Sequence, residues 1–177
     1  MAGPDRSPLA SLLERVRDAA LAVEATTSFT PIDRALSTQK GPSPNLLYDV
    51  LISGAALRKS TQKLFHDGHY AEAVRKAFVL VNNEVKSRTG SAKDGAELMN
   101  RAFGTATPEL RLNAGLTQSD HDEQEGYRFI FAGAMTGIRN PRSHDPIADD
   151  PESALEMIVL ANHLLRVLAR AIVGATP

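Results

Sequence analysis

Apolar residues recur every three or four positions through most of the chain, and this spacing limits what the chain can fold into. The clearest segment carries one apolar face, formed by Tyr70, Ala73, Val74, Ala77, Phe78, Val81 and Val85. Side chains at this spacing line one side of an α-helix. No segment sustains the alternation of apolar and polar residues that a half-buried strand requires, and no tight Asn-Gly or Asp-Gly turn joins two strand-like runs. The sequence therefore predicts an all-α fold.

The same spacing divides the chain into helices that are bounded by residues known to start or stop a helix. These helices cover approximately residues 9–25, 45–65, 70–88, 96–103, 119–139 and 151–172. Asp67-Gly68 is expected to end the second helix, because glycine readily adopts the left-handed conformation at a helix end. Pro141 is expected to end the fifth helix near residue 139, because the residue before a proline is pushed out of the helical region.

Residues 26–44 interrupt the helical pattern. They contain Pro31, Pro42 and Pro44 together with Thr, Ser and Gly, which is a composition typical of a linker. We therefore expect an N-terminal helix and Pro-rich linker over residues 1–45, followed by one bundle-like helical domain over residues 46–177. A chain of 177 residues is long enough to bury a sizeable apolar core in one such domain.

The composition excludes several kinds of site. The chain has no Cys, which rules out disulfides, thiolate catalysis and zinc sites built on cysteine. Its formal net charge is -1 at pH 7, so any phosphate-binding surface has to be local. No apolar run reaches the ~20 residues that cross a bilayer, and the N-terminus lacks a signal-peptide core. We expect a cytoplasmic protein without membrane contact.

Two cations, an amide and an imidazole lie within six residues, directly after the apolar helix that is expected to end near residue 139. The segment consists of Arg139, Asn140, Pro141, Arg142, Ser143 and His144. Around an unbroken helix Arg139 and His144 would lie about 140° apart, whereas a turn at Pro141 would bring both side chains to one cleft. Asn140 is suited to cap a short new helix whose free N–H groups point at an anion.

These residue types suit cleavage of a phosphodiester bond without a metal. An arginine guanidinium matches phosphate oxygens and keeps its charge, so Arg139 would stabilise the charge that develops at phosphorus. A histidine exchanges protons near neutral pH, so His144 would take the proton of a ribose 2′-OH or give one to the leaving 5′ oxygen. Arg142 and Ser143 are candidate contacts to RNA phosphates, although Arg142 also fits a merely exposed position.

A simpler interpretation of the same segment is a polar helix end. Arg139 would then lie near the last helix carbonyls and His144 in a solvated turn. Asp145 is a weak candidate to orient His144, because adjacent residues rarely face one another.

His66 and His69 lie three positions apart, which invites comparison with a metal site. Gly68 interrupts the helix between them and the sequence offers no third ligand, so we expect no metal. We also expect no cofactor, because the apolar face that begins at Tyr70 is better explained as core.

The spacing of Arg139 and His144, with four residues between them and Asn140 directly after the Arg, resembles the Arg-x4–6-His motif of HEPN domains. HEPN domains are small helical bundles. The surrounding sequence resembles one branch, the Ymh-type hypothetical-protein family, over roughly residues 46–172. The segments that carry this second resemblance are Leu64-Phe65, Gly68-His69-Tyr70-Ala71-Glu72-Ala73-Val74, Gly133-Ala134-Met135, Ile138-Arg139-Asn140-Pro141 and His144.

The resemblance carries implications for function. Many HEPN domains are metal-independent ribonucleases, which implies that Arg139 and His144 form the catalytic pair and that Asn140 orients the motif or touches phosphate. HEPN ribonucleases usually act as homodimers, which implies two motifs that face each other across a cleft, with one His as base and its twin as acid. The resemblance further implies RNA as substrate and an antitoxin or anti-phage defence protein as partner.

Three functions are compatible with the sequence. The first is an RNA endonuclease that leaves a 2′,3′-cyclic phosphate and a 5′-OH, and the presence of both Arg139 and His144 favours it. The second is a non-catalytic HEPN module that binds RNA, nucleotide or a partner protein. The near-zero net charge favours this second function, because bulk RNA affinity comes from phosphate neutralisation. A purely structural dimerisation scaffold would leave the Arg-Asn-His cluster unexplained.

Overall fold

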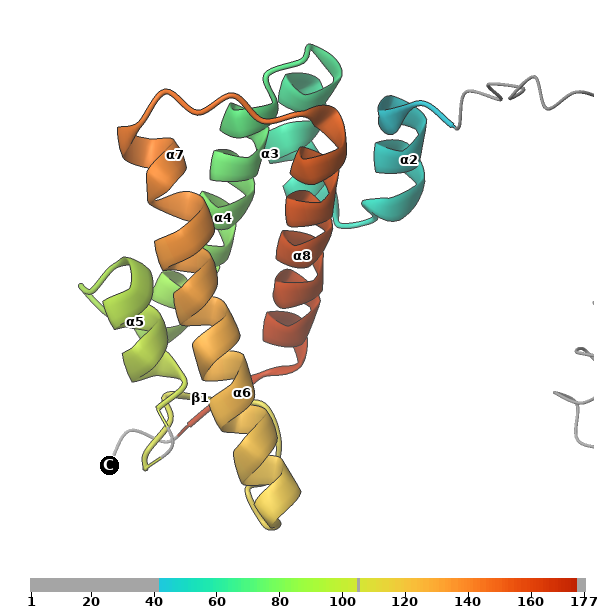
Figure 1. Cartoon of the computed structure of the whole chain (residues 1–177). Coiled ribbons are helices and arrows are strands. Elements are labelled where there is room, and N and C mark those ends of the chain that lie inside the picture. The colour runs from blue at the N-terminus through green and yellow to red at the C-terminus, as the bar shows by residue number, and fades with distance from the viewer. Residues whose placement is uncertain (1–41, 105, 175–177) are drawn as a thin grey trace, which may run out of the picture. The chain divides into compact units, whose positions relative to one another are not determined.

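A computed structural model describes residues 42–104 and 106–174, and these residues form a bundle of helices (Figure 1). The elements are α2 Pro44–Leu51, α3 Ala55–His66, α4 Tyr70–Thr89, α5 Gly95–Ala102, β1 Leu110–Arg111, α6 Gln118–Ala134, the π-helical turn η1 Met135–Arg139, α7 Pro141–His144, α8 Pro151–Arg170 and β2 Ile172–Val173. The expected all-α fold is confirmed. The helix predicted over residues 9–25 and most of the predicted linker lie outside the described residues.

Helix α4 is the centre of the bundle. It packs against α3, α5, α7, α8 and η1. Its buried side chains are Ala73, Val74, Ala77, Phe78, Val81, Asn82 and Val85. The apolar face predicted from the sequence therefore faces the core, with Tyr70 partly buried at its edge and the polar Asn82 as an unexpected member. None of the helices in the described part of the chain has the length and apolarity needed for a bilayer crossing.

The single helix predicted over residues 45–65 is wrong, because the chain breaks between α2 and α3. Ile52 and Gly54 both adopt extended backbone conformations there. Gly54 lies so close to α8 that an added Cβ would come within 3.2 Å of the Asn162 side chain. Arg58 of α3 donates hydrogen bonds to the Asp49 carbonyl at 3.4 Å and the Ile52 carbonyl at 3.5 Å, and so satisfies the end of α2.

The predicted helix end at Asp67-Gly68 is present. Gly68 has a φ of 82°, which is the left-handed conformation that glycine adopts without steric cost. The Gly68 N–H donates to the Phe65 carbonyl at 3.1 Å, and the His69 N–H donates to the Leu64 carbonyl at 2.8 Å. This pair of bonds is the Schellman arrangement, and it reverses the chain so that α4 packs back on α3.

A short ladder closes the end of the bundle that lies opposite α7 (Figure 1). Strands β1 and β2 are antiparallel, with Leu110 opposite Val173. The buried side chain of Gln124, on α6, holds the β1 segment in place. Its amide donates to the carbonyls of Phe103 and Leu110 at 3.2 and 3.0 Å, and its oxygen accepts the Leu112 N–H at 3.0 Å. The sequence pattern predicted neither the ladder nor this role of Gln124.

A buried hydrogen bond between α2 and α3 gives a test of the core. The Tyr48 hydroxyl lies 2.7 Å from the Thr61 hydroxyl, which itself donates to the Leu57 carbonyl at 2.8 Å. Tyr48 is therefore the donor, and burial raises its pKa.

We expect the two ends of this bond to respond unequally to mutation. Tyr48→Phe removes a donor and leaves Thr61 bonded to Leu57, so the free energy of unfolding should fall by about 1 kcal/mol. Thr61→Val leaves the Tyr48 hydroxyl buried without a partner, and the loss should be about 1–3 kcal/mol. Urea unfolding of both variants measures the difference. A larger loss in Tyr48→Phe would contradict this assignment of donor and acceptor.

Candidate functional site

The predicted turn at Pro141 is not found. Helix α6 runs through η1 and Asn140 into α7, and Asn140 keeps helical angles of φ -64° and ψ -47° (Figure 1). The π-helical turn explains the continuity. The Asn140 N–H donates to the Met135 carbonyl, five residues back, at 3.0 Å. A proline ring clashes with the carbonyl four residues before it in a regular α-helix, and a wider turn relieves that clash.

The continuous helix keeps Arg139 and His144 on different sides. Five residues of α-helix rotate the side-chain direction by about 140°. Within the described residues, no hydrogen bond or ion pair joins the two side chains, and neither lines the clefts of about 1190 and 270 Å³. The expected meeting of both groups at a bent corner is therefore wrong for a single chain.

The expected anion site at a capped N-terminus of α7 is also wrong. The Asn140 side chain does not cap α7 but accepts a hydrogen bond from Arg139 Nη1 at 3.0 Å. The Ser143 N–H donates to the Asn140 carbonyl at 2.9 Å. Because α7 continues an existing helix, it does not present the set of free N–H groups that a new helix start would offer.

Arg139 is held by a polar network that reaches into the core. Its Nη2 donates to Asp94 Oδ2 at 3.0 Å, and its side chain is 22% exposed. Its Nε is buried and has no hydrogen-bond partner in the described part of the chain. The other oxygen of Asp94 accepts a hydrogen bond at 2.6 Å from the buried amide of Asn82, whose own oxygen accepts the Gly95 N–H at 2.9 Å. The guanidinium is thus positioned by α4, α5 and η1 together.

Asn82 and Asp94 are not among the site residues that the sequence pattern predicted. One signal was available, since Asn82 is a polar residue four positions after Phe78 on the apolar face of α4. A polar residue on a buried face needs a hydrogen-bond partner. The partner itself was not predictable, because Asp94 lies beyond the end of α4 and reaches Asn82 only through the packing of α5.

His144 is the last residue of α7 and is exposed. The Asp145 N–H donates to the Pro141 carbonyl at 2.9 Å, and the chain then leaves the helix. The loop that follows forms one wall of a cleft of about 270 Å³, whose other wall is the start of α4. That cleft is lined by Gly68, His69, Tyr70, Ala71, Glu72, Ile147, Ala148 and Asp149.

His66 and His69, which were considered as metal ligands, have separate surroundings. The ring of His66 packs edge-on against Tyr48, and its Nε2 lies 3.3 Å from the Asp49 carboxylate. His69 is exposed at the start of α4. Among the residues that the structure describes, no group of three or more His, Asp or Glu side chains is arranged to hold a metal ion.

Arg142 forms a nearly buried ion pair. Its Nε and Nη2 donate to the two carboxylate oxygens of Asp149, both at 2.6 Å, and its Nη1 donates to the Ile138 carbonyl at 3.0 Å. The side chains of Arg142 and Asp149 are 10% and 8% exposed. An RNA phosphate would have to displace Asp149 to bind this guanidinium. Ser143 is exposed and donates to the Arg139 carbonyl at 2.9 Å. RNA contact by these two residues stays a prediction.

The Arg142–Asp149 pair attaches the loop after His144 to the helix, and its contribution is measurable. We expect Asp149→Ala to lower the free energy of unfolding by about 3–5 kcal/mol, because it leaves a buried guanidinium without its counter-charge. The double variant Arg142→Met, Asp149→Leu should recover much of that loss, since apolar side chains of similar size remove the buried charge altogether. Chemical denaturation of both variants measures these free energies of unfolding. An equal loss in the single and the double variant would argue against a buried ion pair.

Comparison with known protein families gives a match over the part of the chain that contains the Asn82–Asp94–Arg139 network. A family model described as "Protein of unknown function (Hypoth_ymh)" matches residues 54–168. No significant match was found among curated proteins or among solved structures. The matched residues include α4, the Asn82–Asp94–Arg139 network and His144. Since the match covers more than half of the sequence, the chain belongs to the Hypoth_Ymh family.

Proposed function

We propose that this chain is a metal-independent RNA endonuclease of the HEPN type, in which Arg139 stabilises the charged phosphate and His144 transfers the proton. The observation that carries the proposal is the fixed guanidinium of Arg139, held by Asp94 and Asn140, five residues before an exposed imidazole. A cation that is positioned before substrate binds needs no reorganisation when charge develops at phosphorus.

The local backbone supports this assignment. Arg139 ends a π-helical turn, and such turns are rare and occur frequently at functional sites. The buried Nε of Arg139 has no partner among the described residues, and most buried donors in proteins are paired. The Nη1 and Nη2 atoms of Arg139 each carry a second N–H beyond their bonds to Asn140 and Asp94, and these donors are suited to bind an additional oxygen, such as that of a phosphate.

The proposed enzyme is a homodimer, because one chain keeps Arg139 and His144 apart. An exposed strip on α6 and η1 leads up to the motif. Phe129 and Ile130 are 59% and 45% exposed, and a Cβ added at Gly133 or Gly137 would have no neighbour within 4 Å. Positions three and four apart share a helix face, so the apolar side chains and the bare glycines lie along one strip. A second copy of the strip would pack there about a twofold axis.

In the proposed reaction, the imidazole of one His144 takes the proton of a ribose 2′-OH, and the 2′ oxygen attacks phosphorus. The bond from phosphorus to the 5′ oxygen breaks, and the imidazolium of the second chain gives that oxygen a proton. The products are a 2′,3′-cyclic phosphate and a 5′-OH. Because one histidine has to be neutral and the other protonated, the rate should pass through a maximum as pH changes. A role in a toxin–antitoxin or anti-phage system is part of the same proposal and rests on the HEPN resemblance.

A second candidate function is a non-catalytic module that binds RNA or a partner protein. The observation that favours it is the separation of Arg139 and His144 within one chain, together with the commitment of Arg142 to Asp149. A binding module of this kind does not need a site that is formed by two chains.

Cleavage of mixed RNA in EDTA distinguishes the two candidates. We expect the wild-type protein to cut RNA without divalent metal. His144→Ala and Arg139→Ala should each lower the rate by about 100-fold or more, because acid–base catalysis and charge stabilisation each contribute at least that much. Lys59→Ala, an exposed position on α3, is the charge-removing control and should cut normally. RNA that is retained but intact would support the binding module, and full activity in His144→Ala would refute the enzyme.

The dimer is tested separately by sedimentation. Phe129→Asp puts a charge in place of the largest apolar side chain of the strip and should convert the dimer to a monomer, with loss of RNA cleavage. Leu116→Asp is the matched control, because Leu116 is 83% exposed and lies before α6, away from the strip. A monomeric wild-type protein, or an unchanged dimer in Phe129→Asp, would rule out this interface.

A further inference from the structure

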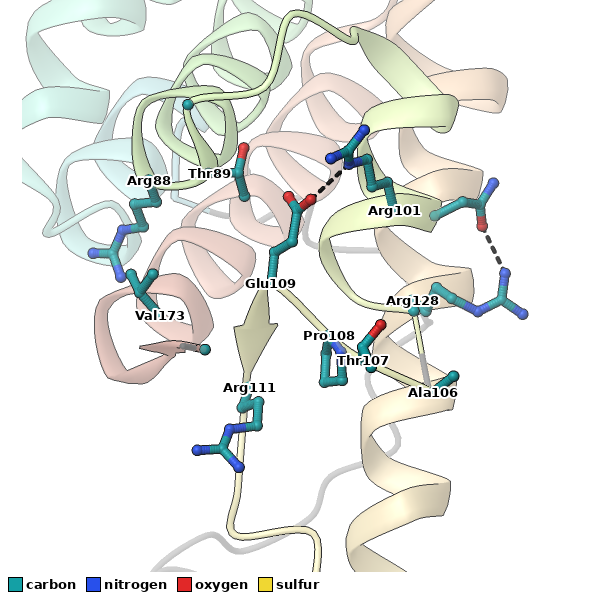
Figure 2. A pocket seen from close by; sticks show the side chains of 14 residues that line it. Arg88, Thr89, Arg101, Ala106, Thr107, Pro108, Glu109, Arg111, Arg128 and Val173 are labelled. Carbon is teal, nitrogen blue, oxygen red and sulfur yellow. Dashed lines mark hydrogen bonds and ion pairs between the residues drawn. The ribbon is translucent and has the colours of Figure 1, made fainter. Parts of the chain in front are cut away.

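One cleft that has no part in the proposed nuclease is rich in arginine. It has a volume of about 1190 Å³ and lies between the end of α4, the end of α5, β1, β2 and α6, at the end of the bundle opposite α7 (Figures 1 and 2). The charged side chains that line it are those of Arg88, Arg101, Arg111, Arg128 and Glu109. Four cations and one anion therefore face a single concave surface.

The arginines differ in how many donors they have left for a ligand. All three guanidinium nitrogens of Arg128 donate, Nε and Nη2 to Glu125 and Nη1 to the Asn100 side chain at 2.6 Å. Arg88 donates through Nε to Glu84 at 2.8 Å and through Nη1 to the Leu168 carbonyl at 2.6 Å. Its Nη2 has no partner within the described ranges.

Arg101 and Arg111 have the most free donors. Arg101 uses only its Nε, which donates to Glu109 Oε1 at 2.6 Å, and its side chain is 59% exposed. Arg111 is exposed and makes no side-chain hydrogen bond or ion pair with any residue described here. Since Glu84 and Glu125 offset two of the lining cations, Arg111 supplies the excess positive charge of the cleft.

The backbone segments that carry Arg88 and Arg111 are linked through β2 and the residue before it. Arg111 is paired with Ile172 in the β1–β2 ladder, and Arg88 Nη1 also lies 3.4 Å from the Ala171 carbonyl just before β2. Figure 2 accordingly shows Arg88 and Arg111 on either side of Val173, with Glu109 and Arg101 on the neighbouring wall. Arginine forks at several points around one concavity suit an anion with several oxygens spread over more than one centre.

The single carboxylate of the lining and the volume of the cleft limit which ligands would fit. Glu109 contributes a carboxylate to the lining, which is an acceptor for a hydroxyl or amino group of a ligand. With one carboxylate in its lining, the cleft offers a divalent cation too few ligands, so the anion would be bound by arginine directly. The cleft volume of about 1190 Å³ lies somewhat above the roughly 300–1,000 Å³ of typical small-molecule sites, so the cleft has room for a ligand of nucleotide size.

We propose that this cleft binds a small molecule with linked phosphate groups, of the size and chemistry of a nucleoside diphosphate. Arg101, Arg111 and Nη2 of Arg88 bind the phosphate oxygens. Glu109 accepts a hydrogen bond from a hydroxyl or amino group of the same molecule. This site goes beyond the proposed nuclease, since it uses neither Arg139 nor His144.

Calorimetric titration of the full chain in EDTA tests the proposal, with ADP and inorganic pyrophosphate as probes. We expect both to bind the wild-type protein. Tighter binding of ADP would identify a nucleotide as the ligand, whereas equal affinity would identify the linked phosphates as the recognised group, and both results support the proposal.

Variants connect the binding to the cleft. Arg111→Ala and Arg101→Ala should each weaken ADP binding by about tenfold or more, because each removes a charged hydrogen bond. Arg111→Lys should fall between wild type and Arg111→Ala, since it keeps the charge and loses the fork. Lys59→Ala is the matched control and should bind normally. His144→Ala should also bind normally, which separates this site from the nuclease.

Three results would overturn the proposal. One is the absence of binding of either probe to the wild-type protein. Another is binding that is unchanged in Arg111→Ala and Arg101→Ala. The third is an RNA oligonucleotide that depends on Arg111 for binding and is not displaced by ADP or pyrophosphate, because the cleft would then be an RNA-binding surface.

Discussion

The buried amide of Asn82 is the contact on which the arrangement of the candidate site depends. A polar group in an apolar core costs free energy unless its donors and acceptors are satisfied. Asn82 satisfies both by donating to Asp94 and accepting from Gly95, so the start of α5 has to lie against α4. The second oxygen of Asp94 is thereby placed to receive Arg139. The position of the proposed catalytic cation is thus a consequence of core packing.

Pro141 does not end the helix in which it lies, although a proline usually does. A proline usually ends a helix, but here the π-helical turn before it accommodates the ring and the helix continues. The candidate residues are therefore spread around a helix end and do not converge on one cleft. For the nuclease proposal, a second chain has to complete the site. The Arg142–Asp149 pair then serves to hold the loop after the helix.

The net charge of -1 conceals a marked local distribution of arginines. Three of the described arginines are paired with carboxylates a turn away on the same helix, in Arg75–Glu72, Arg88–Glu84 and Arg128–Glu125, and such pairs add little to phosphate affinity. Arginines with donors to spare include Arg139 at the end of η1 and those of the arginine cleft at the other end of the bundle. The expectation that any phosphate-binding surface would be local is consistent with this distribution.

The sequence by itself determined the fold class, several of the helices and the identity of the motif. The three- and four-residue spacing identified α4 and its buried face, and Gly68 marked the end of α3, because helix periodicity and glycine backbone freedom are local properties. Only the tertiary structure decided that Ile52 and Gly54 would separate α2 from α3 and that Asn82 would find Asp94. It also decided that Arg88 and Arg111 would face one cleft. These features depend on contacts between residues distant in the chain, and no local pattern of side chains specifies which distant partner a residue will meet.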